Sequence, residues 1–85
     1  MNSSANEIIP EDPIHPGEIL KDELNSRAIS QQQLAEGMNM SKSEISLLLH
    51  GKRNITAHIA VLLEKALNID AEVWMNLQSN YDITL

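Results

Sequence analysis

Two helix-start signals lie close together in the middle of the chain, and they constrain its fold more than any other feature. Ser30 is followed three residues later by Gln33, and Ser41 is followed three residues later by Glu44. In each pair the hydroxyl can accept from the backbone N–H of the third residue while the longer side chain reaches back, an arrangement called a capping box. The stretch between the two serines has room only for one short helix and a tight corner. The sequence therefore predicts two short helices in direct succession.

The corner between these helices has its own signals. Asn39 lies where the chain must turn sharply, and Asn is the best tolerated residue after Gly in a left-handed backbone conformation. Ala35 lies where two steeply crossed helices would press together, and a larger side chain would push them apart. Three apolar residues are expected to fill the angle: Leu34, Ile45 and Leu48. The pattern predicts a helix-turn-helix, with a plain helical hairpin as the alternative.

Three further helices are expected around this pair. The first begins at Pro16, carries Glu18 in its first turn and ends near Arg27. The second helix of the pair, which begins after Ser41, is expected to end at Gly51 in a left-handed conformation. The fourth helix, capped by Thr56, is expected to bury one stripe: Ile59, Ala60, Leu63, Ala66 and Leu67. The fifth, capped by Asp70, is expected to carry on one side Val73, Trp74, Leu77 and Tyr81.

These five helices predict an all-α domain over residues 14–85. Residues 1–13 are polar, contain Pro10 and Pro13 and show no periodicity, so we expect a flexible arm there. The 85 residues suffice for one small domain, which lacks cysteine and therefore any disulfide or thiolate metal site. Small domains of this kind often bury further surface by pairing, so a dimer is expected. The apolar runs are too short to cross a bilayer and the start lacks the features of a signal peptide, which favours the cytoplasm.

Charge is divided unevenly along the chain. The formal net charge is −6, yet residues 30–58 carry Lys42, Lys52 and Arg53 against Glu36 and Glu44, and are the only net positive third. An acidic body weakens non-specific attraction to nucleic acid and suits a basic protein partner. The alternative is an ordinary soluble acidic surface. Glu44 itself is interpreted as a structural cap of its helix rather than a group that contacts bases.

The second helix of the pair has a sparse outward face. On a helical wheel, Ser43, Ser46, Leu47 and His50 lie opposite the buried stripe, with Lys42 at the edge. Small polar side chains and one apolar residue could enter a major groove, where serines specify bases weakly and Leu47 could contact a thymine methyl. Leu47 could equally be an isolated surface leucine.

Phosphate contacts have separate candidates. The free N–H groups at the start of the first helix of the pair, with Gln31 and Gln32, could bind an anion. Lys52 and Arg53 follow the outward-facing helix and could reach the flanking backbone; the alternative is a solvated pair of loop charges. His15, His50 and His58 lack the spacing of metal ligands, and neither a catalytic constellation nor a phosphate-binding loop is present. We therefore expect no enzyme, no metal and no cofactor.

The sequence resembles a known family in four stretches. "ISQQQLAEGMNMSKSEISLLLHGKRNIT" resembles the helix-turn-helix of the phage-repressor-like (XRE) class. "HPGEILKDEL", "GKRNITAHIAVLLEKAL" and "WMNLQSNYDI" resemble the HigA antitoxin family, also called VapI. Together they cover residues 14–83, and the His-Pro-Gly-Glu opening with the Trp-x-Asn-Leu-Gln close is the more specific part.

The resemblance implies an antitoxin that binds a HigB-type RNA-cleaving toxin and represses its own operon as a dimer. Ser41, Lys42 and Ser43, with Ser46 and Leu47, would then face bases, while Gln31, Lys52 and Arg53 would contact phosphates. The family pattern also implies a dimer through the last helix, at Trp74, Leu77, Gln78 and Tyr81; core packing alone is the alternative for the two aromatic residues. Many relatives carry Arg or Gln where this chain has Ser43 and Leu47, so the base preference does not transfer.

The surface that would bind the toxin is inferred from charge rather than from the resemblance. An RNA-cleaving toxin is expected to be basic, which makes the acidic first helix, with Glu18, Asp22 and Glu23, a candidate surface. Two other functions stay open: a free-standing repressor without a toxin, and a module that binds only proteins.

Overall fold

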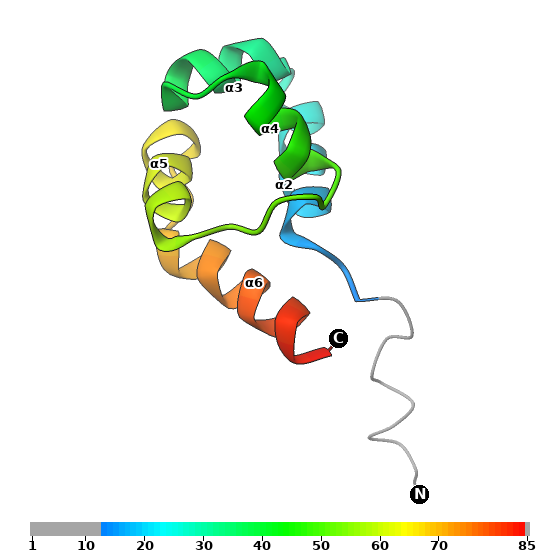
Figure 1. Cartoon of the computed structure of the whole chain (residues 1–85). Helices are drawn as coiled ribbons and strands as arrows, with labels where there is room; N and C mark the ends of the chain where they lie inside the picture. Colours follow the sequence, from blue (N-terminus) through cyan, green and yellow to red (C-terminus); the bar gives the residue numbers. More distant parts are fainter. Residues whose placement is uncertain (1–12, 85) are drawn as a thin grey trace, which may run out of the picture.

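Five helices make up residues 13–84, the part of the chain that the computed structural model describes (Figure 1). They are α2 Pro16–Arg27, α3 Gln31–Met38, α4 Lys42–Leu49, α5 Ala57–Leu67 and α6 Ala71–Thr84. No strand occurs in this range. The predicted all-α, five-helix fold is confirmed. The predicted flexible arm, residues 1–13, lies outside the described residues except for Pro13.

Both predicted capping boxes are present. At α3 the backbone N–H of Gln33 donates to Ser30 Oγ at 3.1 Å, and the backbone N–H of Ser30 donates to Gln33 Oε1 at 2.8 Å. At α4 the corresponding distances between Ser41 and Glu44 are 3.1 and 2.9 Å. Each box satisfies two backbone donors that a helix start otherwise leaves without partners. Helix boundaries here therefore follow from local sequence.

Left-handed residues follow four of the helices. Asn39 has φ 54° and Gly51 has φ 70°, which confirms the predicted conformation of both. Asn68 ends α5 with φ 59°, and Ala28 ends α2 with φ 55°. Alanine has no side-chain group to offset the crowding of its Cβ in this region, so Ala28 carries strain that the two asparagines tolerate better.

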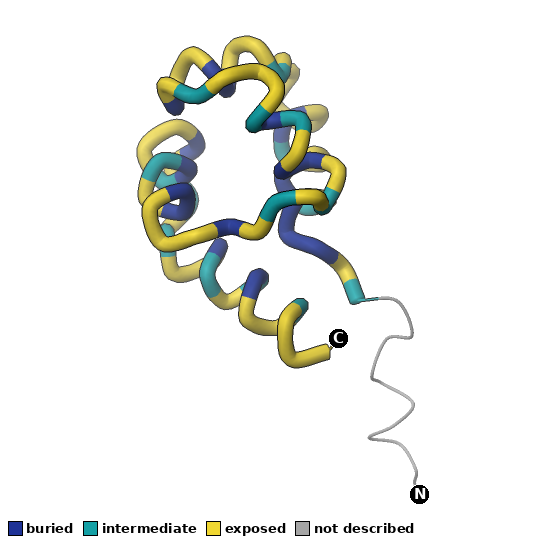
Figure 2. Tube along the Cα trace, in the orientation of Figure 1, coloured by how far each residue is buried: buried dark blue, intermediate teal, exposed yellow. Residues whose placement is uncertain are grey.

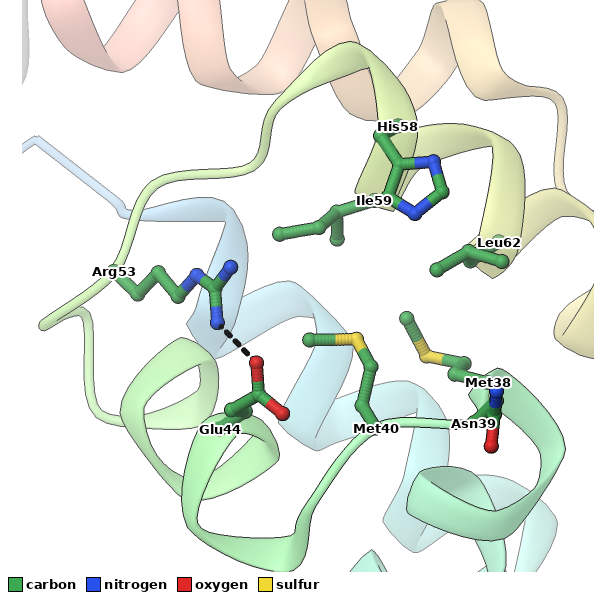
Figure 3. A pocket seen from close by; sticks show the side chains of 8 residues that line it. All are labelled: Met38, Asn39, Met40, Glu44, Arg53, His58, Ile59 and Leu62. Atoms are coloured by element: carbon green, nitrogen blue, oxygen red, sulfur yellow. Dashed lines mark hydrogen bonds and ion pairs between the residues drawn. The ribbon is translucent and has the colours of Figure 1, made fainter.

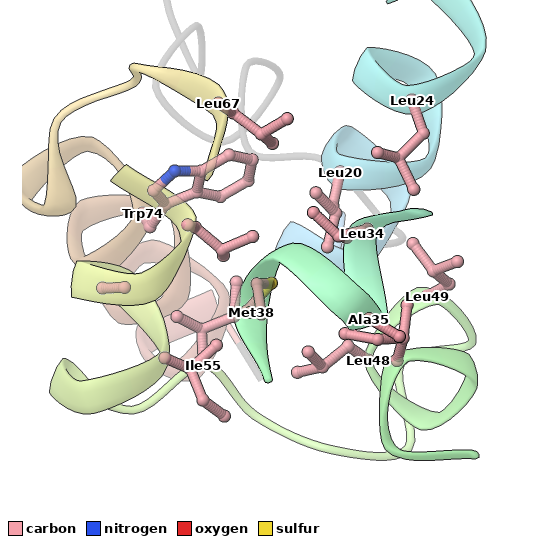
Figure 4. Packing of buried hydrophobic residues seen from close by; sticks show 14 residues of the cluster. Leu20, Leu24, Leu34, Ala35, Met38, Leu48, Leu49, Ile55, Leu67 and Trp74 are labelled. Carbon is pink, nitrogen blue, oxygen red and sulfur yellow. The ribbon is translucent and has the colours of Figure 1, made fainter. Parts of the chain in front are cut away.

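The helices enclose one apolar core (Figure 4). Helix α3 packs on α4 and α5, α2 packs on α4 and α6, and α5 packs on α6. Trp74 from α6 lies against this core and is 1% exposed. The other buried apolar residues are Leu20, Leu24, Leu34, Ala35, Met38, Ile45, Leu48, Leu49, Ile55, Ile59, Ala60, Leu63 and Leu67.

Two of the predicted helix faces differ from those in the structure. Ala66 is exposed, because it lies at the edge of the α5 stripe beside a shallow groove that α3 leaves open. Val73 is 45% exposed, because the buried stripe of α6 runs through Trp74 and Gln78 instead. The expected cap at Asp70 also differs in detail: the Ala71 amide donates to Glu64 Oε1 of α5 at 3.3 Å.

A polar junction joins the start of α2 to the α4–α5 loop and α6; we define it as the buried His15 and Gln78 together with the exposed Asn54. His15 Nδ1 accepts the Gly17 amide at 2.9 Å, so Nε2 carries the proton and donates to Asn54 Oδ1 at 3.3 Å. Gln78 Oε1 accepts the Ile55 amide at 2.7 Å. His15 also meets the ring of Tyr81 edge-on, with centroids 4.8 Å apart. The junction fixes the loop that follows α4.

Helix α2 approaches α4 more closely than any side chain would permit at Gly17. A Cβ added there would lie 1.9 Å from the carbonyl oxygen of Leu48. Because that neighbour is backbone, it has little freedom to move aside. Gly17 is therefore required by the contact between α2 and the end of α4, which sets how the outward face of α4 is presented.

Candidate nucleic-acid interface

Helices α3 and α4 form the corner that the sequence predicts. Ala35, between them, is 4% exposed, and its carbonyl oxygen accepts the Met40 amide at 2.9 Å just past the turn. The three residues expected to fill the angle, Leu34, Ile45 and Leu48, are all buried. A small residue at the crossing, a left-handed Asn39 in the turn and an apolar wedge define a helix-turn-helix rather than a hairpin of antiparallel helices.

The outward face of α4 lies on the surface of the molecule (Figure 2). Lys42, Ser43 and His50 are exposed, Leu47 is 45% exposed and Ser46 is half-buried. Ser41, at the cap, is also exposed. Ser43 lies three and four residues before Ser46 and Leu47, and His50 lies four and three residues after them, so these four side chains are neighbours on the helix surface.

His50 is held against its own helix. Its Nδ1 lies 2.7 Å from the carbonyl oxygen of Ser46 and 3.3 Å from Ser46 Oγ. The short contact to a carbonyl makes Nδ1 the protonated nitrogen and leaves Nε2 available as an acceptor in the neutral ring. This face can thus donate through serine hydroxyls and Lys42 and accept through His50, a combination that fits base edges.

The start of α3 adds a polar edge beside α4. Gln31 is half-buried and Gln32 is exposed. The side-chain nitrogen Nε2 of Gln32 donates to Glu36 Oε2 at 3.5 Å. In the first turn of α3 the Ser30 hydroxyl accepts one backbone N–H, that of Gln33. Other backbone N–H groups of this turn have no carbonyl partner within the helix and point outward. Such amides suit an anion such as a phosphate oxygen.

Lys52 and Arg53 differ in their surroundings, although the sequence treats them as a pair. Lys52 is exposed on the loop after α4. The guanidinium of Arg53 turns back to the start of α4, where Nη1 lies 3.0 Å from Glu44 Oε2 (Figure 3). Both side chains of this ion pair are about two-fifths exposed, at 38% and 41%.

Glu44 serves two partners at once. Oε1 accepts the Ser41 amide at 2.9 Å, which confirms its predicted capping role, and Oε2 accepts from Arg53. The hydrogen bond from the Ser41 backbone, followed by that from Arg53, holds the pKa of Glu44 below its usual range. The carboxylate is therefore fully charged at neutral pH. The Arg53 contact joins residues nine apart, and capping signals alone do not reveal it.

The residues predicted for dimer contact divide into two groups. Trp74 and Gln78 are buried within one chain, at 1% and 4% exposure, so they position α6 and offer almost no surface. Leu77 and Tyr81 are half-buried. They line a groove of about 190 Å³ whose other wall is the segment before α2. Next to it, Ile14 is 57% exposed.

The acidic candidates on α2 also differ from one another. Glu18 accepts the His15 amide at 3.3 Å, and Glu23 pairs with Arg27 at 3.0 Å. Arg27 in turn donates to the carbonyl of Leu67 at the end of α5. Asp22 is exposed and makes no hydrogen bond or ion pair within residues 13–84. Two of the three acids thus have structural roles.

Sequence reasoning missed the residues that position the site. His15 caps α2, and its companion Glu18 completes a third capping box. The spacing of His15, Pro16 and Glu18 was the available signal, but histidine is not among the usual N-cap residues. Asn54 and Gln78 give no local signal, because their partners lie far away in the sequence.

Residues 13–84 hold no group of three His, Asp or Glu side chains close enough to share a metal ion. Every helix in that range is too short or too polar to cross a bilayer. The fold and its exposed α4 face therefore define a helix-turn-helix protein, the class in which the second helix of the motif is presented to a partner.

Comparisons with known proteins give the family. Residues 20–74 match the family described as "Helix-turn-helix". Virulence-associated protein I of Dichelobacter nodosus is 38% identical over 73 residues, which cover 85% of this chain and 68% of that protein. The chain belongs to the HigA/VapI antitoxin family of XRE-class helix-turn-helix proteins.

Solved structures agree with this assignment. An addiction module antidote protein of the HigA family from Coxiella burnetii superposes with a TM-score of 0.80 at 42% identity, covering 85% of this chain and 79% of that one. Pseudomonas aeruginosa antitoxin HigA, solved with the higBA promoter, superposes with a TM-score of 0.79 at 40% identity, covering 84% and 78%. The family consists of DNA-binding regulators and antitoxins and is not a class of enzymes.

Proposed function

We propose that this protein is an antitoxin that binds its own operator DNA as a homodimer and neutralises an RNA-cleaving toxin of the HigB type. The observation that carries the DNA part is the exposed, sparsely polar face of α4, presented at the corner of a helix-turn-helix. A member of the same family was solved with promoter DNA. Family membership supports the antitoxin part.

In this proposal α4 enters the major groove. Ser43, Ser46, Leu47 and His50 face base edges there, with Ser41 and Lys42 at the leading end. The α3 start, with Gln31 and Gln32, and the loop after α4 contact phosphates on either side. Because the serines discriminate weakly, base preference depends chiefly on Lys42 and on the thymine methyl that Leu47 can contact.

The dimer in this proposal uses the groove beside α6. Leu77 and Tyr81 line it together with Pro13, and Ile14 lies exposed at its edge. A second copy related by a two-fold axis would cover these apolar groups and place two α4 helices in successive major grooves, roughly 34 Å apart. Trp74 and Gln78 support the interface by fixing α6 in place.

DNA binding is tested by fluorescence anisotropy with the duplex upstream of the chain's own reading frame and a scrambled duplex of equal length. We expect preference for the promoter duplex and a two-fold stoichiometry by sedimentation. A chain that binds neither duplex but still binds a protein partner would be the protein-only module, and the proposal would be wrong.

The toxin part is tested on α2. Asp22→Lys reverses an acid that has no structural partner within the described residues, so we expect weaker and less salt-dependent binding to the neighbouring toxin. Glu36→Lys, on α3, is the matched control. If no small basic protein is encoded next to this chain, or if the neighbouring product does not bind it, a free-standing repressor is the better description.

A further inference from the structure

We propose that Glu44 is a positioning residue that holds Arg53 away from the DNA backbone and so weakens the affinity of this protein for duplex DNA of any sequence. This inference rests on the proposed DNA-binding function. It assigns to the Glu44–Arg53 pair a role beyond helix capping.

The Glu44–Arg53 pair lies at the edge of the α4 face. Glu44 and Leu47 are three residues apart, so they are neighbours on the helix surface, and Glu44 borders the face proposed to meet bases. A DNA strand passing this edge would bring phosphates close to the guanidinium of Arg53. At 3.0 Å, however, Glu44 Oε2 already occupies one of its donors (Figure 3).

The Glu44 carboxylate is held in place independently of Arg53. The carboxylate is anchored independently by the Ser41 amide at the start of α4, so it is fixed relative to the helix. Its lowered pKa keeps it charged at the pH at which DNA is bound. Arg53 is thus neutralised by an internal counterion, whereas Lys42 and Lys52 have no ion-pair partner within residues 13–84.

Pairing of Arg53 with Glu44 also lowers the salt dependence expected for DNA binding. Each phosphate contact contributes about −0.9 to the slope of log affinity against log salt. If all three cations of each subunit reached phosphates, a dimer would have a slope of roughly −5. With Arg53 held by Glu44, only Lys42 and Lys52 of each subunit count, and the slope falls to roughly −3.6.

The decisive variant is Glu44→Gln. Glutamine can still close the capping box, so α4 keeps its start while Arg53 loses its counterion. We expect affinity for a random-sequence duplex to rise roughly tenfold near 0.1 M salt, and the slope to steepen by about 1.8 per dimer. Circular dichroism checks that the helix content is unchanged.

Two comparisons separate this mechanism from simpler ones. Glu36→Gln removes the same charge from an exposed acid of α3 that pairs with no arginine, and should change affinity by less than about twofold. In an Arg53→Ala background, Glu44→Gln should have no further effect. An equal gain in that background would mean that Glu44 merely repels phosphates, and would overturn the proposal.

If Glu44→Gln binds duplex more weakly, then Glu44 orients Arg53 for a phosphate and the inference is wrong. If wild type binds DNA and Glu44→Gln matches it in affinity and slope, the inference fails while the proposed function stands. A wild-type chain that binds no duplex overturns the proposed function and, with it, the inference.

Discussion

Two regions of this small protein use polar side chains in opposite ways. In the polar junction of His15, Asn54 and Gln78, polar groups have fixed partners and hold the start of α2, the α4–α5 loop and α6 together. On the α4 face, Lys42 and Ser43 are exposed and have no hydrogen-bond partner within residues 13–84. The first region determines where the second lies. Mutations should therefore affect stability in the junction and recognition on the face, with little overlap.

The largest effect is expected at Gly17. Gly17→Ala would place a methyl group 1.9 Å from the Leu48 carbonyl oxygen, so α2 must move away from α4. We expect a loss of about 3 kcal/mol in the free energy of unfolding, measured by urea denaturation. Gly37→Ala is the control, because its added Cβ meets nothing within 4 Å and alanine favours a helix interior by about 0.5–1 kcal/mol. Equal stability of the two variants would contradict this account.

Gln78 tests the junction itself. Gln78→Leu removes the acceptor of the buried Ile55 amide, and an unsatisfied buried donor costs about 1–3 kcal/mol. The unfolding free energy should fall by about 2 kcal/mol, while the affinity of the folded protein for promoter DNA changes far less. Asn76→Ala, on the exposed side of α6, should leave stability within about 0.5 kcal/mol. A large loss of operator affinity without loss of stability would show that the two regions are not separate.

Lys42 on the α4 face and Lys52 on the loop after α4 should affect DNA binding differently. Lys52→Ala should weaken binding to promoter and scrambled duplexes by the same factor, roughly tenfold, and flatten the salt slope by about 1.8 per dimer. Lys42→Ala should also change the preference between sequences, because Lys42 lies at the end of α4 that is proposed to enter the groove. Neither change should alter thermal stability, since both side chains are exposed. Anisotropy titrations across a salt series test both, with Lys65→Ala on α5 as the control.

Ala28 provides a smaller effect of the opposite sign. Its φ of 55° strains an alanine, and glycine adopts this conformation freely. Ala28→Gly should stabilise the protein by about 1 kcal/mol, and thermal denaturation should show a rise of roughly 4–8 °C. Because Ala28 is exposed and ends α2, DNA affinity should be unchanged. A destabilised Ala28→Gly variant would show that the unfolded-state entropy of glycine outweighs the relieved strain.

The same contrast explains what the sequence could predict. Helix starts at Ser30 and Ser41 and the left-handed Asn39 depend on interactions within a few residues, so local patterns sufficed. The corner and the exposed α4 face followed from helical periodicity. The burial of Gln78, the exposure of Ala66 and the contact between Glu44 and Arg53 depend on the paths of distant segments, and no single helix contains that information. Local patterns thus predicted the exposed α4 face, whereas the long-range contacts that position it became known only from the three-dimensional structure.

The smallest effect is the pH dependence of stability at Glu44, where a helix cap and the α4 face meet. The Ser41 amide and Arg53 lower the pKa of this carboxyl in the folded protein. Its stabilising contribution is therefore fully present above the ordinary glutamate pKa of about 4.3, and is lost as the pH falls through the lowered folded value. Wild type should melt above Glu44→Gln at pH 7, and the gap should close as the pH is lowered toward 3.

Taking the difference between these two proteins removes the contribution of every other carboxylate, because both proteins contain them. Thermal melts at intervals between pH 3 and 7 would measure it. A gap that stays constant over this range would mean that Glu44 acts only through the geometry of its cap, which glutamine reproduces equally at every pH. A gap that closes shows that its charge, shared between Ser41 and Arg53, joins the helix start to the surface proposed to approach DNA.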